Sequence, residues 1–324
     1  MALTRVELEN FTAFRSLKLD LSPGVNVLVG ANGTGKTHLM KVCYAACAVS
    51  GSRIDNFAHK LVAVFMPAGR RLLRLVRRGH EGGGRASIRV ESGARKLGAS
   101  FVSHPAPEEG WQLVEVPGDA LSWMHDTIES VYIPVKEMLS NAPGFRSLYA
   151  KREIHFEELY RDILDRAYLP ALRGPMDARR HGATTRLREA IGGDIEVEGE
   201  EFFLRSEQGD FEFSLLAEGI RKLALLWLLI RNGTLQPDSV LFWDEPETNL
   251  NPKLFGVVVD VLLELQRAGV QVFLATHDYV ILKELDLRTT SADKVAFHSL
   301  YRERGRVRPG APRHPAIWRS TRTR

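Results

Sequence analysis

Residues 30–37, Gly-Ala-Asn-Gly-Thr-Gly-Lys-Thr, have the residue types and spacing of a phosphate-binding loop. They match the pattern GxxxxGK[ST], in which glycines let backbone N–H groups converge on phosphate oxygens. Lys36 can reach the terminal phosphates, and the Thr37 hydroxyl can ligate Mg²⁺. The candidate contacts for a nucleotide are therefore Gly30, Asn32, Gly33, Thr34, Gly35, Lys36 and Thr37.

Two acidic residues, Asp244 and Glu245, follow the short apolar run 240–243. Asp244 is the candidate Mg²⁺ ligand, and Glu245 is the candidate base that polarises an attacking water. An Asp-Glu pair after a strand can also simply cap a helix, so this assignment depends on the loop at 30–37. His277 ends the next apolar run and is a candidate contact for the γ-phosphate.

The elements that must position these residues follow from the periodicity of the apolar side chains. Residues 4–9 and 17–21 alternate with period two, which predicts two antiparallel strands. A buried strand is expected at 25–29, followed by a helix at 36–49. Further along, strands and helices alternate, which favours a mostly parallel sheet covered on both faces. The expected elements there are helices at 218–230, 252–266 and 280–285 and strands at 240–243 and 270–275.

The middle of the chain is predicted to contain a β-rich insertion and a helical segment. Residues 57–116 are expected to form a β-rich insertion. Its candidate strands are 61–65, 71–76 and 88–91, with a glycine-rich loop at 80–85. The segment 145–191 is expected to be helical, with breaks near Pro170 and Gly174. A hairpin is expected from 195–197 and 202–204, joined at Gly199.

The order of these motifs resembles that of the ABC-type ATPases, in which the histidine is called the switch. The resemblance implies a signature helix before the Asp-Glu strand, and residues 216–222 match it. In that family the start of this helix contacts the γ-phosphate bound by the other subunit. Ala217, Glu218 and Gly219 would occupy that position here. Ala217 replaces the family's serine, so one hydroxyl contact is missing unless Ser214 supplies it.

Within this family, the run Asp-Glu-Pro-Glu-Thr-Asn-Leu-Asn-Pro at 244–252 looks like the RecF, RecN and OLD-like group. Many of its stand-alone members are AAA-family ATP-binding proteins found in anti-phage defence systems. The opening strand, with Asn10-Phe11 after it, also resembles SMC and RecF heads. Residues 131–140 are similar to the segment that joins the lobes in stand-alone members. ABC-type enzymes have a metal-sensing glutamine there, for which Glu137 is the candidate replacement.

The resemblance implies an α/β P-loop NTPase of the ABC/RecF-like type, with a mixed sheet, a β-rich insertion and a helical lobe. Its expected parts begin with 1–135, the N-terminal part of the ATP-binding lobe. The helical lobe with the hairpin follows at 136–215, and the C-terminal part of the ATP-binding lobe at 216–301. A basic, flexible tail is expected at 302–324.

The same resemblance implies ATP and Mg²⁺ as ligands, and two copies that dimerise head to head on ATP. Such a slow, regulatory ATPase would control a separately encoded effector, for example a Toprim- or HNH-type nuclease, in anti-phage defence. The alternative is a RecF-like DNA-binding ATPase in DNA repair. A transporter subunit is disfavoured by Glu247 and Asn251, which depart from the transporter pattern.

Composition narrows the class of protein further. The chain has 324 residues and a formal net charge of +4. The tail from Arg302 holds eight arginines and one glutamate, so the preceding chain is slightly acidic and not a basic nucleic-acid-binding domain by charge alone. A solvated face is a better interpretation of the five arginines at 70–78 than a DNA groove. Cys43 and Cys47 are expected to be buried. No apolar run is long enough to cross a bilayer, so a cytoplasmic protein is expected.

Overall fold

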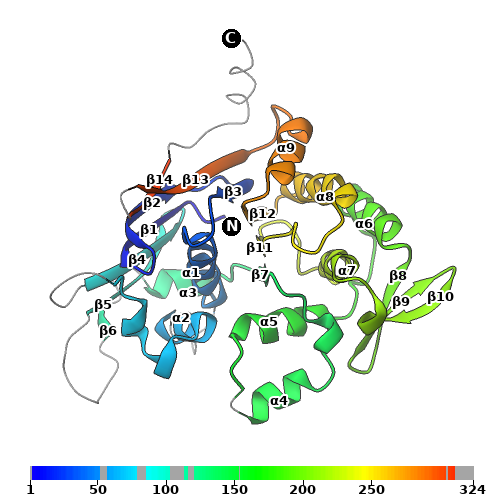
Figure 1. Cartoon of the computed structure of the whole chain (residues 1–324), viewed down its shortest axis with the longest axis horizontal. Coiled ribbons are helices and arrows are strands. Elements are labelled where there is room, and N and C mark those ends of the chain that lie inside the picture. Colours follow the sequence, from blue (N-terminus) through cyan, green and yellow to red (C-terminus); the bar gives the residue numbers. More distant parts are fainter. Residues whose placement is uncertain are drawn as a thin grey trace. The chain divides into compact units, whose positions relative to one another are not determined.

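The computed structural model describes residues 2–51, 57–78, 85–102, 113–115, 120–152, 154–303 and 306–310. The chain forms two compact units, shown with their elements in Figure 1. The first unit combines Met1–Glu129 with Val295–Arg324, and the second is Ser130–Lys294. The four-part division expected from the sequence stays a prediction. No helix within the described ranges has the length and apolar character needed to span a membrane.

An antiparallel sheet in the first unit has the strand order β2-β1-β4-β5-β6. Its strands are β1 (Arg5–Phe11), β2 (Phe14–Asp20), β4 (Arg85–Ser92), β5 (Arg95–Val102) and β6 (Leu113–Glu115). Val6 pairs with Leu19 and Leu8 with Leu17, and all four side chains are buried. The period-two alternation therefore predicted this antiparallel pair correctly.

A second group of strands in the first unit leads into the phosphate loop. β3 (Val25–Val29) pairs in parallel with β13 (Val295–Glu303), which pairs antiparallel with β14 (Arg306–Pro309). The helices are α1 (Lys36–Ala48), α2 (Phe57–Phe65) and α3 (Ala120–His125). Cys43 and Cys47 are buried on α1, as expected, and burial raises the pKa of the Cys43 thiol to about 12.

Two expectations for the first unit are wrong. Residues 61–65 belong to α2, because the buried side chains of that helix recur at helical spacing and pack against α1, which outweighs their strand propensity. Residues 71–76 form a short 3-10 turn, η2 (Leu72–Leu75), that follows another, η1 (Ala68–Arg70). The expected loop at 80–85 lies almost wholly outside the described residues.

The prediction of a flexible tail from residue 302 is also wrong for its first residues. Residues 302 and 303 end β13, and β14 pairs back onto it, with Arg302 opposite Val307. Leu300 of β13 and Val307 of β14 lie on the same face and are both buried, so the hairpin has apolar positions that the arginine count conceals. Residues 311–324 lie outside the described part of the chain.

The second unit is built around a fully buried parallel strand. β11 (Val240–Asp244) lies between β7 (Ser130–Ile133) and β12 (Gln271–Thr276), and both pairings are parallel. Every residue of the three strands is buried. Continuous apolar runs of this kind are typical of strands covered on both faces.

Helices cover these strands and link them to a small hairpin sheet. The helices are α4 (Phe145–Lys151), α5 (Glu158–Ala167), α6 (Ala178–Ile191), α7 (Glu218–Arg231), α8 (Phe255–Arg267) and α9 (Tyr279–Arg288), with short 3-10 turns η3 (Leu139–Asn141), η4 (Phe213–Leu215) and η5 (Pro252–Leu254). The hairpin sheet contains β8 (Asp194–Glu198), β9 (Glu201–Ser206) and β10 (Gly209–Glu212). α5 packs on β7, α8 packs on β12, and α6 contacts both α7 and α8 (Figure 1). The helices and the hairpin of β8 and β9 agree with the sequence expectations, apart from small shifts at their ends, whereas β10 and the 3-10 turns were not expected.

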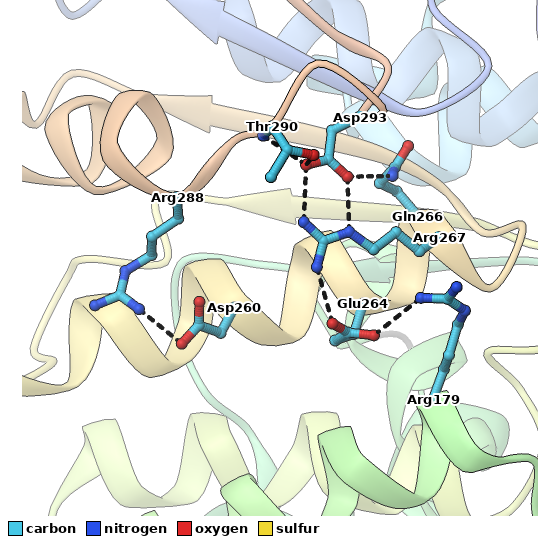
Figure 2. A network of polar contacts seen from close by, with 8 residues as sticks. All are labelled: Arg179, Asp260, Glu264, Gln266, Arg267, Arg288, Thr290 and Asp293. Carbon is cyan, nitrogen blue, oxygen red and sulfur yellow. Dashed lines mark hydrogen bonds and ion pairs between the residues drawn. The ribbon is translucent and has the colours of Figure 1, made fainter.

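A polar network connects α8, α9 and the segment that follows α9 (Figure 2). Arg267 donates to both oxygens of Asp293, at 2.7 and 2.8 Å, and its third nitrogen donates to Glu264 at 2.8 Å. Thr290 also donates to Asp293, through its backbone N–H and its hydroxyl. These charge-assisted hydrogen bonds fix the end of the second unit.

Candidate active site

The phosphate loop joins β3 to α1 in the first unit, and its backbone requires glycine. Gly33 and Gly35 have φ of 76° and 92°, a left-handed conformation that other residues rarely adopt. A Cβ at Gly35 would also lie 2.5 Å from Cζ of Phe14, and one at Gly30 would lie 2.2 Å from the carbonyl oxygen of Leu300. Any larger residue at these two positions would therefore displace the loop.

The side chains of the loop fall into two groups. Lys36 Nζ donates to the carbonyl oxygen of Gly30 at 2.7 Å, and Thr34 Oγ1 donates to that of Ala31 at 2.8 Å. These bonds hold the loop closed on itself. Asn32 is exposed, and the half-buried Thr37 hydroxyl forms no hydrogen bond within the described residues, so both are available to a ligand. Arg302 of β13 donates to the Gly33 carbonyl oxygen at 2.8 Å.

A cavity of about 450 Å³ in the first unit is lined by His38, which directly follows this loop, and by Arg302, which is bonded to it. Thr12 Oγ1 and His38 Nδ1 are buried there without a hydrogen-bond partner in the described structure. Burial, with a smaller contribution from the charge of Lys41, lowers the pKa of His38 to about 4, so its ring is neutral near pH 7. The ring of Phe65 lies 5.6 Å from that of His38. Arginines complete the lining at Arg74, Arg77, Arg78 and Arg302.

Asp244, the first residue of the Asp244-Glu245 pair, ends the buried strand β11 of the second unit. It is almost fully buried, and Tyr132 Oη of the neighbouring strand β7 donates to its Oδ2 at 3.0 Å. Burial and the adjacent carboxylate raise the pKa of Tyr132 well above its usual value, so the phenol stays a donor. This bond orients the carboxylate that the sequence assigns to Mg²⁺.

Glu245 has a strained backbone and a partner on each carboxylate oxygen. Its φ is 47°, and strain of this kind in a non-glycine residue clusters at functional sites. His277 Nδ1 lies 3.3 Å from Glu245 Oε1, and Thr248 Oγ1 donates to Oε2 at 3.4 Å. The structure thus brings together Glu245 and His277, which are far apart in the sequence.

The start of α7 packs against the loop that follows Glu245. A Cβ at Gly219 would lie 2.7 Å from the carbonyl oxygen of Asn249, and Asn249 Nδ2 donates to Glu218 Oε2 at 2.8 Å. Ala217 is the N-cap residue of α7, and its side chain provides no capping hydrogen bond. The exposed Ser214 and Ala217 leave this helix end accessible.

Glu137 is bonded to groups of the protein. Its side chain is fully buried and accepts hydrogen bonds from the backbone N–H of Leu139, from Ser140 Oγ and from Arg221 Nε. No group of three or more metal-ligating His, Cys, Asp or Glu residues is found in the described residues. The hydroxyl of Thr37 and the carboxylate of Asp244 are nevertheless the hard oxygen donors that Mg²⁺ prefers.

Several residues of the site were missed by sequence reasoning. Glu247 Oε1 accepts from Thr276 Oγ1 at 2.6 Å and from the backbone N–H of His277, so it fixes the segment that carries the histidine. Its place in Asp-Glu-Pro-Glu was a usable signal. Lys222 and Arg221 look like ordinary helix residues in the sequence, and His38 and Tyr132 lie in apolar surroundings. No spacing rule identifies these four.

Comparisons with known proteins agree with the motifs. A family profile described as "AAA domain, putative AbiEii toxin, Type IV TA system" matches residues 95–283, more than half of the chain. A second profile, described as "AAA ATPase domain", matches residues 1–60, which include the phosphate loop.

Short stretches are similar to curated proteins described as "DNA replication and repair protein RecF". The protein from Acidothermus cellulolyticus is 55% identical over 47 residues, 14% of this chain and 13% of that protein. The one from Heliobacterium modesticaldum is 49% identical over 41 residues, 13% of this chain and 11% of that protein. The chain thus spans only about an eighth of the length of these relatives.

Solved structures match over nearly the whole chain. The SMC head domain from Thermotoga maritima has a TM-score of 0.50 and 16% identity, and the match covers 96% of this chain and 100% of that one. An SMC head bound to the C-terminal winged-helix domain of ScpA has a TM-score of 0.57 and 12% identity, covering 99% and 100%. At such identities the likeness concerns the fold alone.

Proposed function

Because the chain belongs to the AAA-domain family whose profile covers residues 95–283, and has the α/β P-loop fold of the SMC and RecF type, we propose that it is an ATP-hydrolysing switch that controls a separate effector protein. The observation that carries the proposal is the pairing of Glu245 and His277. Glu245 directly follows the buried Asp244 at the end of β11.

The first unit is assigned to nucleotide binding. The backbone N–H groups of residues 30–37 and the Lys36 ammonium bind the phosphates, and the start of α1 adds the positive end of its dipole. The nucleoside enters the adjoining cavity, where the unpartnered Thr12 Oγ1 and His38 Nδ1 can bond to it. A neutral imidazole suits this position, because it can accept or donate a hydrogen bond.

The second unit is assigned to hydrolysis. Asp244 of this unit and Thr37 of the first unit are the proposed Mg²⁺ ligands, and the ion would neutralise charge on the phosphates. Glu245 accepts a proton as a water oxygen bonds to the γ-phosphorus, the bond from that phosphorus to ADP breaks, and inorganic phosphate leaves. His277, held beside Glu245, donates a hydrogen bond to the γ-phosphate. Ala217, Glu218 and Gly219 would contact the nucleotide of a second copy.

The effector is proposed to be a separate protein, for example a Toprim- or HNH-type nuclease. The family description names a toxin and a type IV TA system, which fits a role in defence. No cluster of metal ligands that could serve a nuclease occurs within the described ranges. ATP-dependent association of two copies would then change the state of the effector.

The experiment uses tagged Glu245→Gln expressed with its native neighbouring genes and purified with ATP and Mg²⁺. We expect the variant to bind ATP, to hydrolyse it very slowly, and to elute in a large complex with a second protein. Lys36→Ala, which removes the phosphate contact, is the matched control and should release that protein. Full turnover by Glu245→Gln would show that the base is misassigned.

A RecF-like DNA-binding ATPase is the second candidate, and the arginines of the cavity favour it. Arg74, Arg77 and Arg78 form no ion pair with an acidic residue of the described structure. Such a cationic rim suits phosphate backbones and predicts salt-sensitive binding. Purified protein should then bind DNA at low salt, and Arg77→Gln/Arg78→Gln should reduce the affinity. Arg186→Gln, on the exposed face of α6, is the matched control. No binding at low salt would exclude this candidate.

A further inference from the structure

A buried ion pair connects the segment after β7 to the start of α7. The distance from Arg221 Nε to Glu137 Oε2 is 2.5 Å, and the Glu137 side chain is fully buried while that of Arg221 is 14% exposed. The other oxygen of Glu137 accepts from the backbone N–H of Leu139. These bonds fix the position of the Glu137 carboxylate, because moving it would leave a buried charge without its partner.

Arg221 also bonds to the turn before α7. Its Nη1 donates to the carbonyl oxygens of Phe213 and Leu216. Phe213 begins η4, and Leu216 is the first residue of the motif at 216–222. A single guanidinium thus fixes both the segment after β7 and the chain entering α7.

Lys222, the next residue, makes the connection from α7 to the candidate base. Its side chain is 1% exposed, and Nζ donates to the carbonyl oxygen of Thr248 at 2.7 Å. Thr248 in turn donates to Glu245, through its backbone N–H to the carbonyl oxygen at 3.1 Å and through Oγ1 to the carboxylate at 3.4 Å. Consecutive residues of one helix therefore hold the segment 137–139 and the loop 245–248.

We propose that Glu137, Arg221 and Lys222 are positioning residues that couple the start of α7 to the orientation of Glu245. This role rests on the proposed hydrolysis at Glu245 and replaces the metal-sensing role expected for Glu137. When the start of α7 engages a nucleotide of a second copy, the displacement reaches Thr248, and through it the base. The orientation of the Glu245 carboxylate thereby depends on whether the start of α7 contacts a nucleotide.

Figure 2 shows a second buried ion pair, which has no contact with Glu245 and serves as the matched control. Asp293 is a fully buried carboxylate side chain held by Arg267, whose side chain is 26% exposed. Its contacts join Arg267 and Gln266 of α8 to Thr290, and none of them involves Glu245 or its partners. Asp293→Asn therefore lowers the stability of the fold by breaking a buried ion pair, as Glu137→Gln does, but leaves the proposed coupling to Glu245 intact.

The test is a double-mutant cycle with steady-state ATP hydrolysis. Glu137→Gln and Arg221→Gln should each lower kcat about tenfold and leave the KM for ATP within about twofold, because the ligand contacts are intact. The double variant should be no slower than the slower single variant, since the pair acts as a unit. Lys222→Met should give the same pattern. Asp293→Asn should lower Tm but keep kcat.

Hydrogen–deuterium exchange over residues 245–250 gives a second readout that needs no turnover. Exchange there should quicken in Glu137→Gln and Lys222→Met and stay unchanged in Asp293→Asn. If Glu137→Gln keeps wild-type kcat and exchange, or loses only Tm as Asp293→Asn does, the coupling is overturned. If Glu137→Gln does not fold, Arg221→Lys, which keeps the charge but not the forked bonds, replaces it in both assays. Absent turnover in the wild type would contradict the proposed function, while the exchange data would still decide the coupling.

Discussion

His277 Nδ1 lies 3.3 Å from Glu245 Oε1, although 31 residues separate the two along the chain. Glu245 follows β11 and His277 follows β12, and these strands are parallel neighbours. Their carboxyl ends therefore lie at the same edge, which brings the two side chains together. Glu245 also has a positive φ, a strained conformation whose cost the surrounding bonds must offset.

This pairing predicts separate effects on binding and turnover. Glu245→Gln should lower ATP turnover about 10²- to 10³-fold, because it removes the group that takes the proton. His277→Ala should lower it less, since the base remains. Both should bind ATP as the wild type does, measured by calorimetry. Glu201→Gln, an exposed acid on β9, is the control and should change neither quantity.

A glycine comparison tests the phosphate loop. Gly35 and Gly93 both have positive φ, 92° and 60°, but an added Cβ meets Phe14 Cζ at 2.5 Å at Gly35 and nothing within 4 Å at Gly93. Alanine at either site should cost about 1 kcal/mol from the backbone conformation. Only Gly35→Ala should also lose ATP binding. Equal ATP affinity in the two variants would contradict the loop assignment.

The sequence was most informative where buried strands end in polar residues. The loop at 30–37 was placed correctly between a strand and a helix, and the pair Asp244-Glu245 between a strand and a turn. Each follows a short, uninterrupted apolar run, which is typical of a buried strand. Period-two alternation gave β1 and β2 in the same way. The strands expected at 61–65 and 71–76 were wrong, since Val62 and Val64 pack in a helix and residues 72–75, three of them leucines, form a 3-10 turn.

The contacts within the site could not be predicted from the sequence. Glu137 was read as a metal-sensing residue from its position alone, and its bond to Arg221 joins residues 84 apart. Lys222 resembles any surface lysine of a helix until the structure shows it buried on the Thr248 carbonyl. Spacing rules describe one element at a time, whereas these bonds connect different elements.

The network at the end of the second unit predicts acid-dependent stability. Its hydrogen bonds from Arg267 lower the pKa of Asp293 to about 2, below the ordinary value of 3.8. The stabilisation is therefore complete above pH 4, at about 2 kcal/mol, and is lost as the pH falls through 2. Asp293→Asn should be less stable than the wild type at pH 7, and the difference should shrink between pH 4 and pH 2. Chemical unfolding at several pH values measures this, and a constant difference would contradict it.

His38 predicts a second pH dependence, in a different range. Its pKa is about 4 in the folded protein, because the ring is buried in the cavity beside Phe65, with the charge of Lys41 nearby. In the unfolded chain the pKa is about 6.5, so between pH 6.5 and 4 the unfolded state binds the proton first and becomes favoured. The part of the loss that His38 contributes should reach about 3 kcal/mol below pH 4 and should be missing in His38→Gln, so the two proteins should differ by that amount. Burial also lowers the pKa of His298 to about 4, but His298 is present in both proteins, so its contribution cancels in their difference. NMR titration of the His38 ring near pH 6.5 in the folded protein would contradict this prediction.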